Sequence, residues 1–506
     1  MDVLLGIDLG TSGLKAVVFD PLGRQLGRGY VANRYLSGFG TSAEQDPETW
    51  WRGCCQALKT ALREAGIAED AVAGIGVCGF HHCPVFLKEN GKPARASIVT
   101  HDSRLEDSLE DLKKHGILAR ITEMTGSRVT TGHFPVIFHY VRAHDRQALD
   151  ASWWIVLAKD YLRYKLTGQV GTELCDATGT HLVAMPDETW STELCDLLGV
   201  PVEKLPEIGQ SSRVDAALSK EAARATGLRK GTPVVFGGGD SHCALLGLGV
   251  IEEMQVGLLL GTNSTLRLVF RVFQKLKEPP VWIQRHVVNQ TYTASASSMA
   301  GASALAWLRD TLLTSTVGTQ SSDSGYRDLE TMAAGVTPGS DGLLFHPYIY
   351  GERSPFYNLK ARGSFLAIGH HHGRAHFVRS VMEGVAFATA NNFDMLLDLP
   401  WTAQKRIKAV RTGLSGGSEM KTWQQILANA LSRPLEVMNV QEPGCLGAAI
   451  LAGLGTGLYR DSADAIAKTV RIHSVVQPEN EVAALYQDRR KCFNETYQAL
   501  RPVLYT

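Results

Sequence analysis

An aspartate beside a glycine-containing turn is the first feature of the sequence that could do chemistry. A hydrophobic run beginning at Leu4 contains Asp8 and leads directly into Gly10, Thr11 and Ser12. Backbone N–H groups of such a turn, with the Thr and Ser hydroxyls, form sites for anions such as phosphate groups. The stretch therefore predicts a phosphate site with a carboxylate beside it.

Three further glycine-rich stretches could bind phosphate in the same way. They are LLGTNST (259–265), RTGLSGGSEMK (411–421) and EPGCLGAAILAGLGTG (442–457). The chain contains no G-x-x-x-x-G-K-[ST] sequence, and no G-x-G-x-x-G is followed by a helix and an acidic residue. These patterns exclude a P-loop NTPase and an obvious Rossmann dehydrogenase.

A second aspartate, Asp240, follows three glycines in FGGGDSHCALLGLG (236–249). The stretch predicts a strand, a glycine turn that another backbone or a ligand can approach closely, and a helix of small residues. Asp240 could simply cap that helix. The helix N-terminus also suits an anion or a reacting phosphoryl group nearby. Both interpretations stay open on these residues alone.

The elements that must position these residues alternate between strands and helices. Runs rich in Val, Ile and Leu, such as residues 71–80 and 231–239, alternate with helical patterns. One helix is expected over residues 47–66, with Asp46 as N-cap and Pro47 at its first position. Alternation of this kind predicts an α/β fold.

An internal echo indicates two similar domains. GTSGLKAVVF (10–19) and GTNSTLRLVF (261–270) each place Gly-Thr nine residues before Phe, with a similar apolar pattern between. We expect an N-terminal domain over residues 1–249 and a C-terminal domain over residues 250–506. The copies differ in one respect, because Leu259 stands where the first copy has Asp8.

Composition narrows the class of protein. The 506 residues include 51 Lys and Arg against 51 Asp and Glu, so there is no bulk electrostatic reason to bind nucleic acid or an anionic membrane. The nine cysteines are odd in number and include no C-x-x-C, which is typical of reduced thiols in a cytoplasmic protein. Histidine-rich segments such as residues 370–376 invite a zinc interpretation, but no Cys/His spacing repeats a known structural site.

Taken in order along the chain, the motifs resemble those of the FGGY carbohydrate kinases, most closely the xylulokinase-like and gluconokinase-like members. The resemblance runs nearly end to end, and its stretches include GIDLGTSGLKAVVFD, KDYLRYKLTG (159–168), CDATGT (175–180), GGGDS, GERSPFYN, GGSEMK and GCLGAAILAGLG. It implies two actin-like, ribonuclease-H-like domains flanking a catalytic cleft. The N-terminal domain would bind sugar and phosphate, and the C-terminal domain would bind the nucleotide.

The resemblance also implies roles for the residues above. Asp240 matches the base that takes a proton from the attacking sugar hydroxyl. Asp8 matches the aspartate that acts on magnesium, often through water, and Asp240 would be the other carboxylate near the metal. The residues implied to contact the phosphates and the nucleoside are Thr11, Ser12, Gly261, Thr262, Gly416, Gly417, Ser418, Gly444 and Leu446. For Gly444 and its neighbours, close helix packing is an alternative explanation.

The sugar site departs from the family pattern. Xylulokinases usually carry Gln-Met-His where this chain has Phe80, His81 and His82. His82 keeps the histidine position and is the leading candidate for a sugar ligand, although a histidine here could equally be a core residue bonded to backbone. The other implied sugar-binding residues are His81, Asp102, Arg104, Asp240 and Ser241. A second family signature runs from Gly363 to Glu383, with Ala367 where glycine is usual.

The resemblance implies an ATP- and Mg²⁺-dependent kinase, acting on D-xylulose before other sugars. Gluconate or another polyol or ketose is the alternative within the family. A non-catalytic actin-like binding protein and an actin-like polymer former are alternatives of other classes. The expected partners are a small-molecule sugar and ATP, without nucleic acid or membrane, and a homodimer is left open.

Overall fold

The computed structural model describes residues 2–36, 42–100, 102–276, 279–313, 322–402 and 405–504. The chain forms two compact units. Unit 1 comprises Met1–Ile251, Arg271–Thr293 and Glu442–Val470, and unit 2 comprises Glu252–Phe270, Ala294–Gln441 and Arg471–Thr506. The first boundary lies close to the expected one at residue 249, but the chain returns to unit 1 twice. A single division at residue 249 therefore does not describe the two units.

Unit 1 is built on a mixed sheet in the strand order β11-β12-β5-β1-β2-β3. β1 pairs parallel with β5 and antiparallel with β2, so the turn after β1 reverses the chain at the edge where β5 also ends. The strands are β1 (Val3–Leu9), β2 (Gly13–Phe19), β3 (Gln25–Ala32), β5 (Val72–Gly79), β11 (Val214–Ala217), β12 (Pro233–Val235) and β13 (Gly238–Gly239), the last pairing with β5.

Helix α1 (Pro47–Ala65) covers one face of this sheet. It begins and ends as expected, because the Asp46 side chain accepts a hydrogen bond from Glu48 N and Gly66 ends the helix with φ 63°. Alternate strand residues point to opposite faces, and Leu5 and Ile7 join a core with α1 that contains the fully buried Trp50. Burial of such side chains stabilises the fold by about 1.5–3 kcal/mol each.

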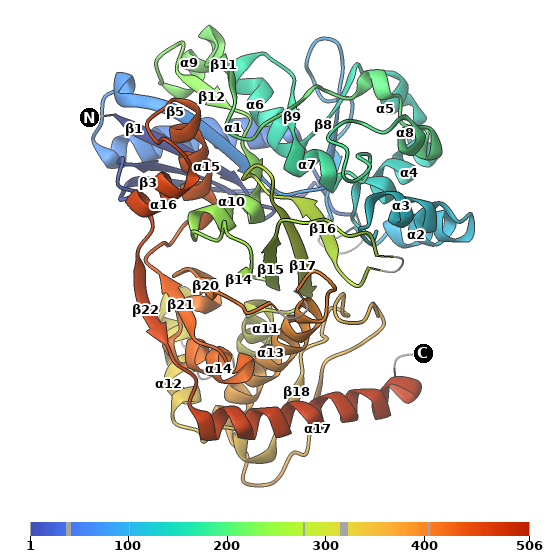
Figure 1. Ribbon diagram of the computed structural model, residues 1–506, viewed down its shortest axis with the longest axis vertical. Helices are drawn as coiled ribbons and strands as arrows, with labels where there is room; N and C mark the ends of the chain where they lie inside the picture. The colour runs from blue at the N-terminus through green and yellow to red at the C-terminus, as the bar shows by residue number, and fades with distance from the viewer. Residues whose placement is uncertain are drawn as a thin grey trace. The chain divides into compact units, whose positions relative to one another are not determined.

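Helix α15 (Pro443–Gly455) lies beside β1 and β5 (Figure 1), although it comes late in the sequence. Glycines make this close approach possible. A Cβ on Gly6 would lie 1.9 Å from the carbonyl oxygen of Cys445, and one on Gly76 would lie 1.9 Å from that of Ala448. Because the sheet offers α15 a glycine-lined surface, residues 442–470 belong to unit 1.

The other helices of unit 1 lie between or after its strands along the chain. They are α2 (Leu105–Lys114), α3 (Ile117–Thr125), α4 (Phe134–His144), α5 (Arg146–Asp150), α6 (Ala158–Thr167), α7 (Leu174–Gly179), α8 (Thr192–Leu198), α9 (Lys220–Thr226), α10 (Asp240–Gly247) and α16 (Ser462–Thr469). Short strands β4 (Glu44–Gln45), β6 (Pro84–Leu87), β7 (Ser97–Ile98), β8 (Trp154–Leu157), β9 (Thr172–Glu173), β10 (Ile208–Gly209) and β16 (Trp282–Arg285) complete it.

Unit 2 repeats the sheet of unit 1. Its strands lie in the order β17-β15-β14-β20-β21-β22, with β14 antiparallel to β15 and parallel to β20, and with β21 antiparallel to β22. The strands are β14 (Gln255–Leu260), β15 (Ser264–Phe270), β17 (Tyr292–Ser298, from Ala294 on), β20 (Ala409–Thr412), β21 (Leu435–Met438) and β22 (Ile472–Val476). The Gly-Thr echo therefore marks the same β-turn in two similar sheets.

Long helices pack around the sheet of unit 2. They are α11 (Ala302–Leu312), α12 (Ser322–Ala334), α13 (Arg374–Leu397), α14 (Lys421–Leu431) and α17 (Asn480–Leu504), with a β-hairpin of β18 (Leu344–His346) and β19 (Ser364–Leu366). Buried polar groups fix α13 in place, since Arg379 Nε and Tyr486 Oη both donate to Glu383 Oε1 at 2.8 Å. None of the described helices is long and apolar enough to cross a membrane.

Candidate active site

Asp8 lies at the end of β1 on the face that α15 covers. It is two residues beyond Gly6, so both residues point to the same side of the sheet. A Cβ on Gly444 would lie 2.8 Å from Asp8 Oδ2, and Asp8 Oδ1 is buried with no hydrogen-bond donor among the described residues. Burial raises the pKa of Asp8 to about 6; Lys15 lowers it, and the nearby charge of Asp240 raises it further.

Lys15 and Glu442 form an ion pair next to Asp8 that the sequence interpretation missed. Lys15 Nζ lies 2.6 Å from Glu442 Oε2, and Arg28 Nε lies 2.9 Å from Glu442 Oε1. Burial alone would lower the pKa of Lys15, but Glu442 and Asp8 outweigh it and the pKa is raised. A lysine kept charged beside the first glycine turn is suited to an anionic ligand. Its only sequence signal was its place shortly after that turn.

The turn between β1 and β2 is held from behind by side chains of unit 1. Asn33 Nδ2 donates to Gly10 O at 2.8 Å, and Gln45 Nε2 donates to Thr11 O at 2.9 Å. Thr11 is half-buried and Ser12 is exposed. The turn is thus fixed by its carbonyl groups, and Ser12 faces solvent.

Asp240 is the first residue of α10 and follows β13 at the end of β5. The N-cap is Gly239, so the sequence alternative of Asp240 as the capping residue is not what the structure shows. Its Oδ1 accepts a hydrogen bond from Ser241 N at 2.5 Å, and the side chain remains 35% exposed. An oriented, accessible carboxylate can accept a proton from a ligand.

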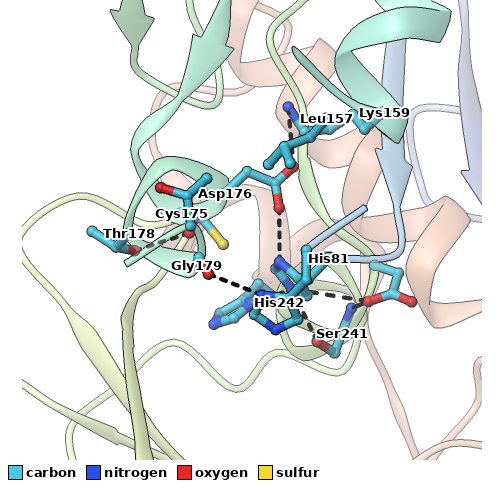
Figure 2. A network of polar contacts seen from close by, with 12 residues as sticks. His81, Leu157, Lys159, Cys175, Asp176, Thr178, Gly179, Ser241 and His242 are labelled. Carbon is cyan, nitrogen blue, oxygen red and sulfur yellow. Dashed lines mark hydrogen bonds and ion pairs between the residues drawn. The ribbon is translucent and has the colours of Figure 1, made fainter. Parts of the chain in front are cut away.

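His81 lies directly beside Asp240, and Figure 2 shows it close to Asp176, Ser241 and His242. Its Nε2 is 3.9 Å from Asp240 Oδ1 and 3.1 Å from Nδ1 of His242, and its Nδ1 is 2.7 Å from Asp176 Oδ1. The ring packs against a glycine, because a Cβ on Gly239 would lie 1.7 Å from His81 Cε1. Asp176 and His242 are therefore part of the site, although the sequence interpretation gave them no role.

A cluster of buried charged residues lies next to His81, on the side of Asp176. Lys159 is fully buried and lies 2.5 Å from Asp160 Oδ1, 3.4 Å from Asp176 Oδ2 and 3.9 Å from Glu173 Oε1. Burial raises the pKa of Glu173 to about 7, although Lys159 lowers it. For Asp176, burial is opposed by Lys159 and His81, and its pKa is lowered. Lys159, Asp160 and Asp176 lie in the two stretches of the family resemblance over residues 159–168 and 175–180, and Glu173 lies between these stretches.

His82 takes the conformation of a structural residue. Its backbone φ is 70°, its Nδ1 lies 2.9 Å from Gly179 O, and its ring stacks on His133 with centroids 4.1 Å apart. The contact with Gly179 O agrees with the alternative interpretation, in which His82 is a core residue bonded to backbone. The ring is half-buried, so a ligand can still reach part of it.

Asp102 and Arg104 pair with each other. Arg104 Nη2 lies 2.6 Å from Asp102 Oδ2 and 2.8 Å from Glu44 Oε1, and Ala43 N donates to Asp102 Oδ2 at 2.9 Å. Asp102 is buried, whereas Arg104 is about one-third exposed. Of the two, Arg104 is the better placed to meet a ligand, with Asp102 holding it.

The nucleotide residues expected in the second half divide between the units. In unit 2, Gly261 and Thr262 are exposed at the turn after β14, and a Cβ on Gly416 would lie 2.8 Å from Leu260 O. Gly416, Gly417 and Ser418 form the short helix η4 (Gly416–Glu419), in which the buried Ser418 hydroxyl bonds that of Thr412 at 2.8 Å. Gly444 and Leu446 instead lie in α15 of unit 1, and Leu446 is 2% exposed.

The donor set around Asp8 fits Mg²⁺. The ion prefers oxygen ligands, keeps several waters, and is usually held by one or two carboxylates with substrate phosphates. Asp8 offers a buried oxygen without a hydrogen-bond donor among the described residues, and the charge of Asp240 acts on Asp8. The half-buried Asp8 and the partly exposed Asp240 thus offer the kind of oxygen ligands that Mg²⁺ takes.

Comparison with known proteins identifies family models that match most of the chain. The N-terminal domain of the FGGY family of carbohydrate kinases matches residues 3–247, and the C-terminal domain matches residues 260–456. The matches bear out the α/β fold class with two similar halves that the sequence predicted.

Individual relatives span nearly the whole chain. The xylulose kinase of Lactococcus lactis is 30% identical, with 92% of this chain and 90% of the relative covered. The autoinducer-2 kinase of Escherichia coli is 28% identical, covering 98% of this chain and 94% of the relative. The crystal structure of xylulose kinase from Rhodospirillum rubrum superposes with a TM-score of 0.87 at 25% identity, with both chains covered completely.

Proposed function

The chain belongs to the FGGY family of carbohydrate kinases, and on that premise we propose that it phosphorylates D-xylulose to D-xylulose 5-phosphate with ATP and Mg²⁺. The single observation that carries the kinase mechanism is the accessible, oriented carboxylate of Asp240 at the start of α10, whose charge acts on the half-buried carboxylate of Asp8. Xylulose kinases among the relatives support the choice of sugar.

Asp240 acts as the general base in this proposal. It accepts the proton of the sugar hydroxyl as that oxygen bonds to the γ-phosphorus and the bond from phosphorus to the β,γ-bridging oxygen breaks, so that ADP leaves. A positioned base typically contributes about 10²–10⁴-fold to the rate. The hydrogen bond from Ser241 N fixes the orientation of Asp240, and its partial exposure lets the substrate reach it.

The remaining residues bind, orient and neutralise charge. When bound, Mg²⁺ would neutralise charge on the phosphates, with Asp8 and Asp240 as the protein carboxylates that would hold it, directly or through water. Thr11 and Ser12 of unit 1 and Gly261 and Thr262 of unit 2 would contact the phosphates. The nucleoside would lie at Gly416, Gly417 and Ser418. Gly444 has a different role here, because it makes room for the Asp8 carboxylate.

His81, His82, Arg104 and Ser241 would contact the sugar, with Asp102 supporting Arg104. A pocket that hydrogen-bonds hydroxyls discriminates strongly, because a wrong sugar leaves buried polar groups unpaired. A gluconate, polyol or other ketose kinase is therefore the second candidate. The observation that favours it is His81, which brings a buried imidazole and the Asp176 carboxylate next to Asp240. The free cysteines support a cytoplasmic enzyme.

A substrate panel tests the proposal. Purified protein with Mg²⁺ and ATP is offered ketoses, polyols and aldonates, and ADP release is measured together with the mass of the product. We expect the highest kcat/KM for D-xylulose. A higher value for an aldonate or polyol would support the second candidate. If no compound of the panel causes ADP release although ATP still binds, a non-catalytic binding protein would be favoured.

A further inference from the structure

We propose that His81, Cys175 and His242 form a binding site for a transition-metal cation of the Zn²⁺ class, separate from the Mg²⁺ that accompanies the nucleotide. The three residues come from the end of β5, from α7 and from α10, and all are buried in unit 1. We further propose that a cation bound there slows phosphoryl transfer. This second part rests on the proposed function, whereas the site itself does not.

The positions of the ligand atoms suit a small cation. One ligand atom from each residue lies within 4.8 Å of the other two, and His81 Nε2 lies 3.1 Å from His242 Nδ1. Two nitrogens at Zn–N distances of about 2.0–2.1 Å in a tetrahedron are roughly 3.3 Å apart. The two nitrogens already have nearly that separation, but they are hydrogen-bonded to each other. Binding therefore requires a rotation of the rings that directs both nitrogen lone pairs to the metal, together with an approach of the Cys175 thiol.

The outer nitrogen of each ring lies close to an oxygen atom. His81 Nδ1 lies 2.7 Å from Asp176 Oδ1, and His242 Nε2 lies 2.8 Å from Thr293 Oγ1. Metal-binding histidines usually contact a carboxylate, carbonyl or water through the second ring nitrogen, which fixes the ring orientation and raises its basicity. The rings are therefore oriented with their inner nitrogens toward each other, as Figure 2 shows for His81 and His242.

The local charge favours a cation. Three carboxyl groups, those of Asp160, Glu173 and Asp176, are at most 1% exposed and lie around Lys159, with the buried Arg163 also close to Asp160. Unpaired negative charge in a low-dielectric interior is costly, and a nearby positive ion offsets it. Asp176 links this charge to the site because it contacts both Lys159 and His81.

The ligand types select the class of metal. Imidazole and thiolate suit Zn²⁺ and Co²⁺, whereas Mg²⁺ prefers oxygen ligands. Excess Mg²⁺ in a kinase assay is therefore a weak competitor. Burial raises the pKa of the Cys175 thiol well above its usual range. Binding consequently displaces one proton from sulfur to solvent as the metal–sulfur bond forms. It also breaks the hydrogen bond between the inner ring nitrogens, and the proton of that bond moves to His242 Nε2, next to Thr293 Oγ1.

The site opens toward the proposed base. His81 Nε2 lies 3.4 Å from Ser241 Oγ and 3.9 Å from Asp240 Oδ1, and Asp240 is 35% exposed. A cation can enter along Asp240 and Ser241, and water or the Asp240 carboxylate can supply its fourth ligand. A cation that takes the Asp240 carboxylate as a ligand occupies the oxygen that would accept the sugar proton, which is why occupation should slow turnover.

Cobalt absorption tests the site without any need for activity. The full-length protein, free of nucleotide, is titrated with Co²⁺, which gives visible d–d bands in a tetrahedral site and a near-ultraviolet thiolate-to-metal band. We expect both, saturating at one equivalent. Cys175→Ser should lose the thiolate band, and His242→Ala should lose tight binding. Cys195→Ser, which changes another buried cysteine, and His371→Ala, in the histidine-rich loop, should keep both.

Thermal unfolding of each metal-free variant identifies any that fail to fold. If His242→Ala does not fold, Cys175→Ser alone decides the assignment. The absence of a thiolate band in the folded wild-type protein would overturn the proposal. So would a band that persists in Cys175→Ser or disappears in Cys195→Ser.

The effect on turnover is measured separately, with Zn²⁺ added to a fixed excess of Mg²⁺ and ATP. We expect at least a tenfold loss of kcat in the wild type, and a much smaller ratio in Cys175→Ser, each protein being compared with itself without Zn²⁺. Equal inhibition of both would overturn the inhibitory role. A cobalt site in a protein that phosphorylates no sugar would contradict the proposed function and leave the site standing.

Discussion

The charge of Asp240 acts on Asp8: it is one of the causes that raise the pKa of Asp8 to about 6, after burial and against the opposing effect of Lys15. Asp8 is half-buried against α15, with its Oδ1 atom buried, and Asp240 is partly exposed at the start of α10. A bound cation would relieve the repulsion between them. In the proposed mechanism, these different environments suit Asp8 to the metal and Asp240 to the proton.

Replacing Asp8 tests the first task. Asp8→Asn should weaken the Mg²⁺ dependence of ATP binding and lower kcat, with little change in KM for the sugar, because only the metal loses a ligand. Titration of Mg²⁺ against nucleotide affinity measures this. Asp20→Asn is the control, since Asp20 is a buried carboxylate that bonds Leu22 N and Arg24 N of its own loop. An unchanged Mg²⁺ dependence in Asp8→Asn would make Asp8 a structural acid.

His82 separates a sugar contact from a structural role. We use His82→Asn because asparagine tolerates the positive φ of this position better than alanine. If the ring contacts the sugar, the KM for the sugar should rise about ten- to a hundredfold, as expected from a lost hydrogen bond of about 1–3 kcal/mol, with KM for ATP unchanged. A fall in Tm with unchanged kinetics would limit His82 to its contacts with Gly179 and His133.

Ala367 is a strained residue that can be relieved. It stands where the family usually has glycine, and its φ is 61°. The left-handed conformation costs a residue with Cβ about 1–2 kcal/mol. Replacement by glycine removes this cost, but part of the gain in stability is lost because glycine has greater freedom in the unfolded chain. Ala367→Gly should therefore raise Tm by about 1–4 °C. The control Ala361→Gly, at a nearby alanine without positive φ, should lower it. A lower Tm in Ala367→Gly would contradict the claim that the positive φ of Ala367 is strained.

Glu352 makes stability depend on pH. Burial raises its pKa to about 7, although the N–H groups of Arg353 and Met299 lower it by donating hydrogen bonds to the carboxylate. The folded protein thus holds this proton to a higher pH than the unfolded chain does. The contribution of Glu352 to stability falls as pH rises from about 4.5 to 7, by roughly 3 kcal/mol, and is constant above that.

Glu352→Gln should remove this slope, because the amide keeps the shape without the charge. Thermal unfolding at pH 5 and pH 8 measures the effect, and the variant should gain stability relative to wild type only at the higher pH. Glu495→Gln, at an exposed position of α17, should leave the slope unchanged. If the variant is less stable than wild type at pH 8, the charged carboxylate stabilises the fold more than a neutral group does, which would contradict the prediction.

Much of this architecture could be predicted from the sequence because its causes are local. The Gly-Thr echo predicted two similar halves, since a turn between antiparallel strands needs the same residue types wherever it occurs. Asp46, Pro47 and Gly66 marked the ends of α1 for the same reason. The place of Asp8 at a strand end followed from hydrophobic patterning alone.

The remaining features depend on contacts between distant segments. Residues 442–470 return to unit 1 because glycines on β1 and β5 leave room for α15, and a glycine in a strand pattern does not reveal its partner. His81 and His242 are 161 residues apart, so no motif spacing could join them. The stretches that contain Lys159 and Asp176 belong to the family resemblance, but the sequence interpretation assigned these two residues no role, and only packing brings them next to His81.

Phosphoryl transfer by the Asp240→Asn variant tests the central claim most directly. Transfer of labelled γ-phosphate from ATP to D-xylulose is measured for wild type and variant at saturating sugar and Mg²⁺, with ATP affinity and Tm measured in parallel. The account predicts labelled D-xylulose 5-phosphate from the wild type. It also predicts at least an ~10²-fold lower kcat in Asp240→Asn, with nucleotide affinity retained. Near-normal turnover in a folded Asp240→Asn protein would contradict the assignment of Asp240 as the base.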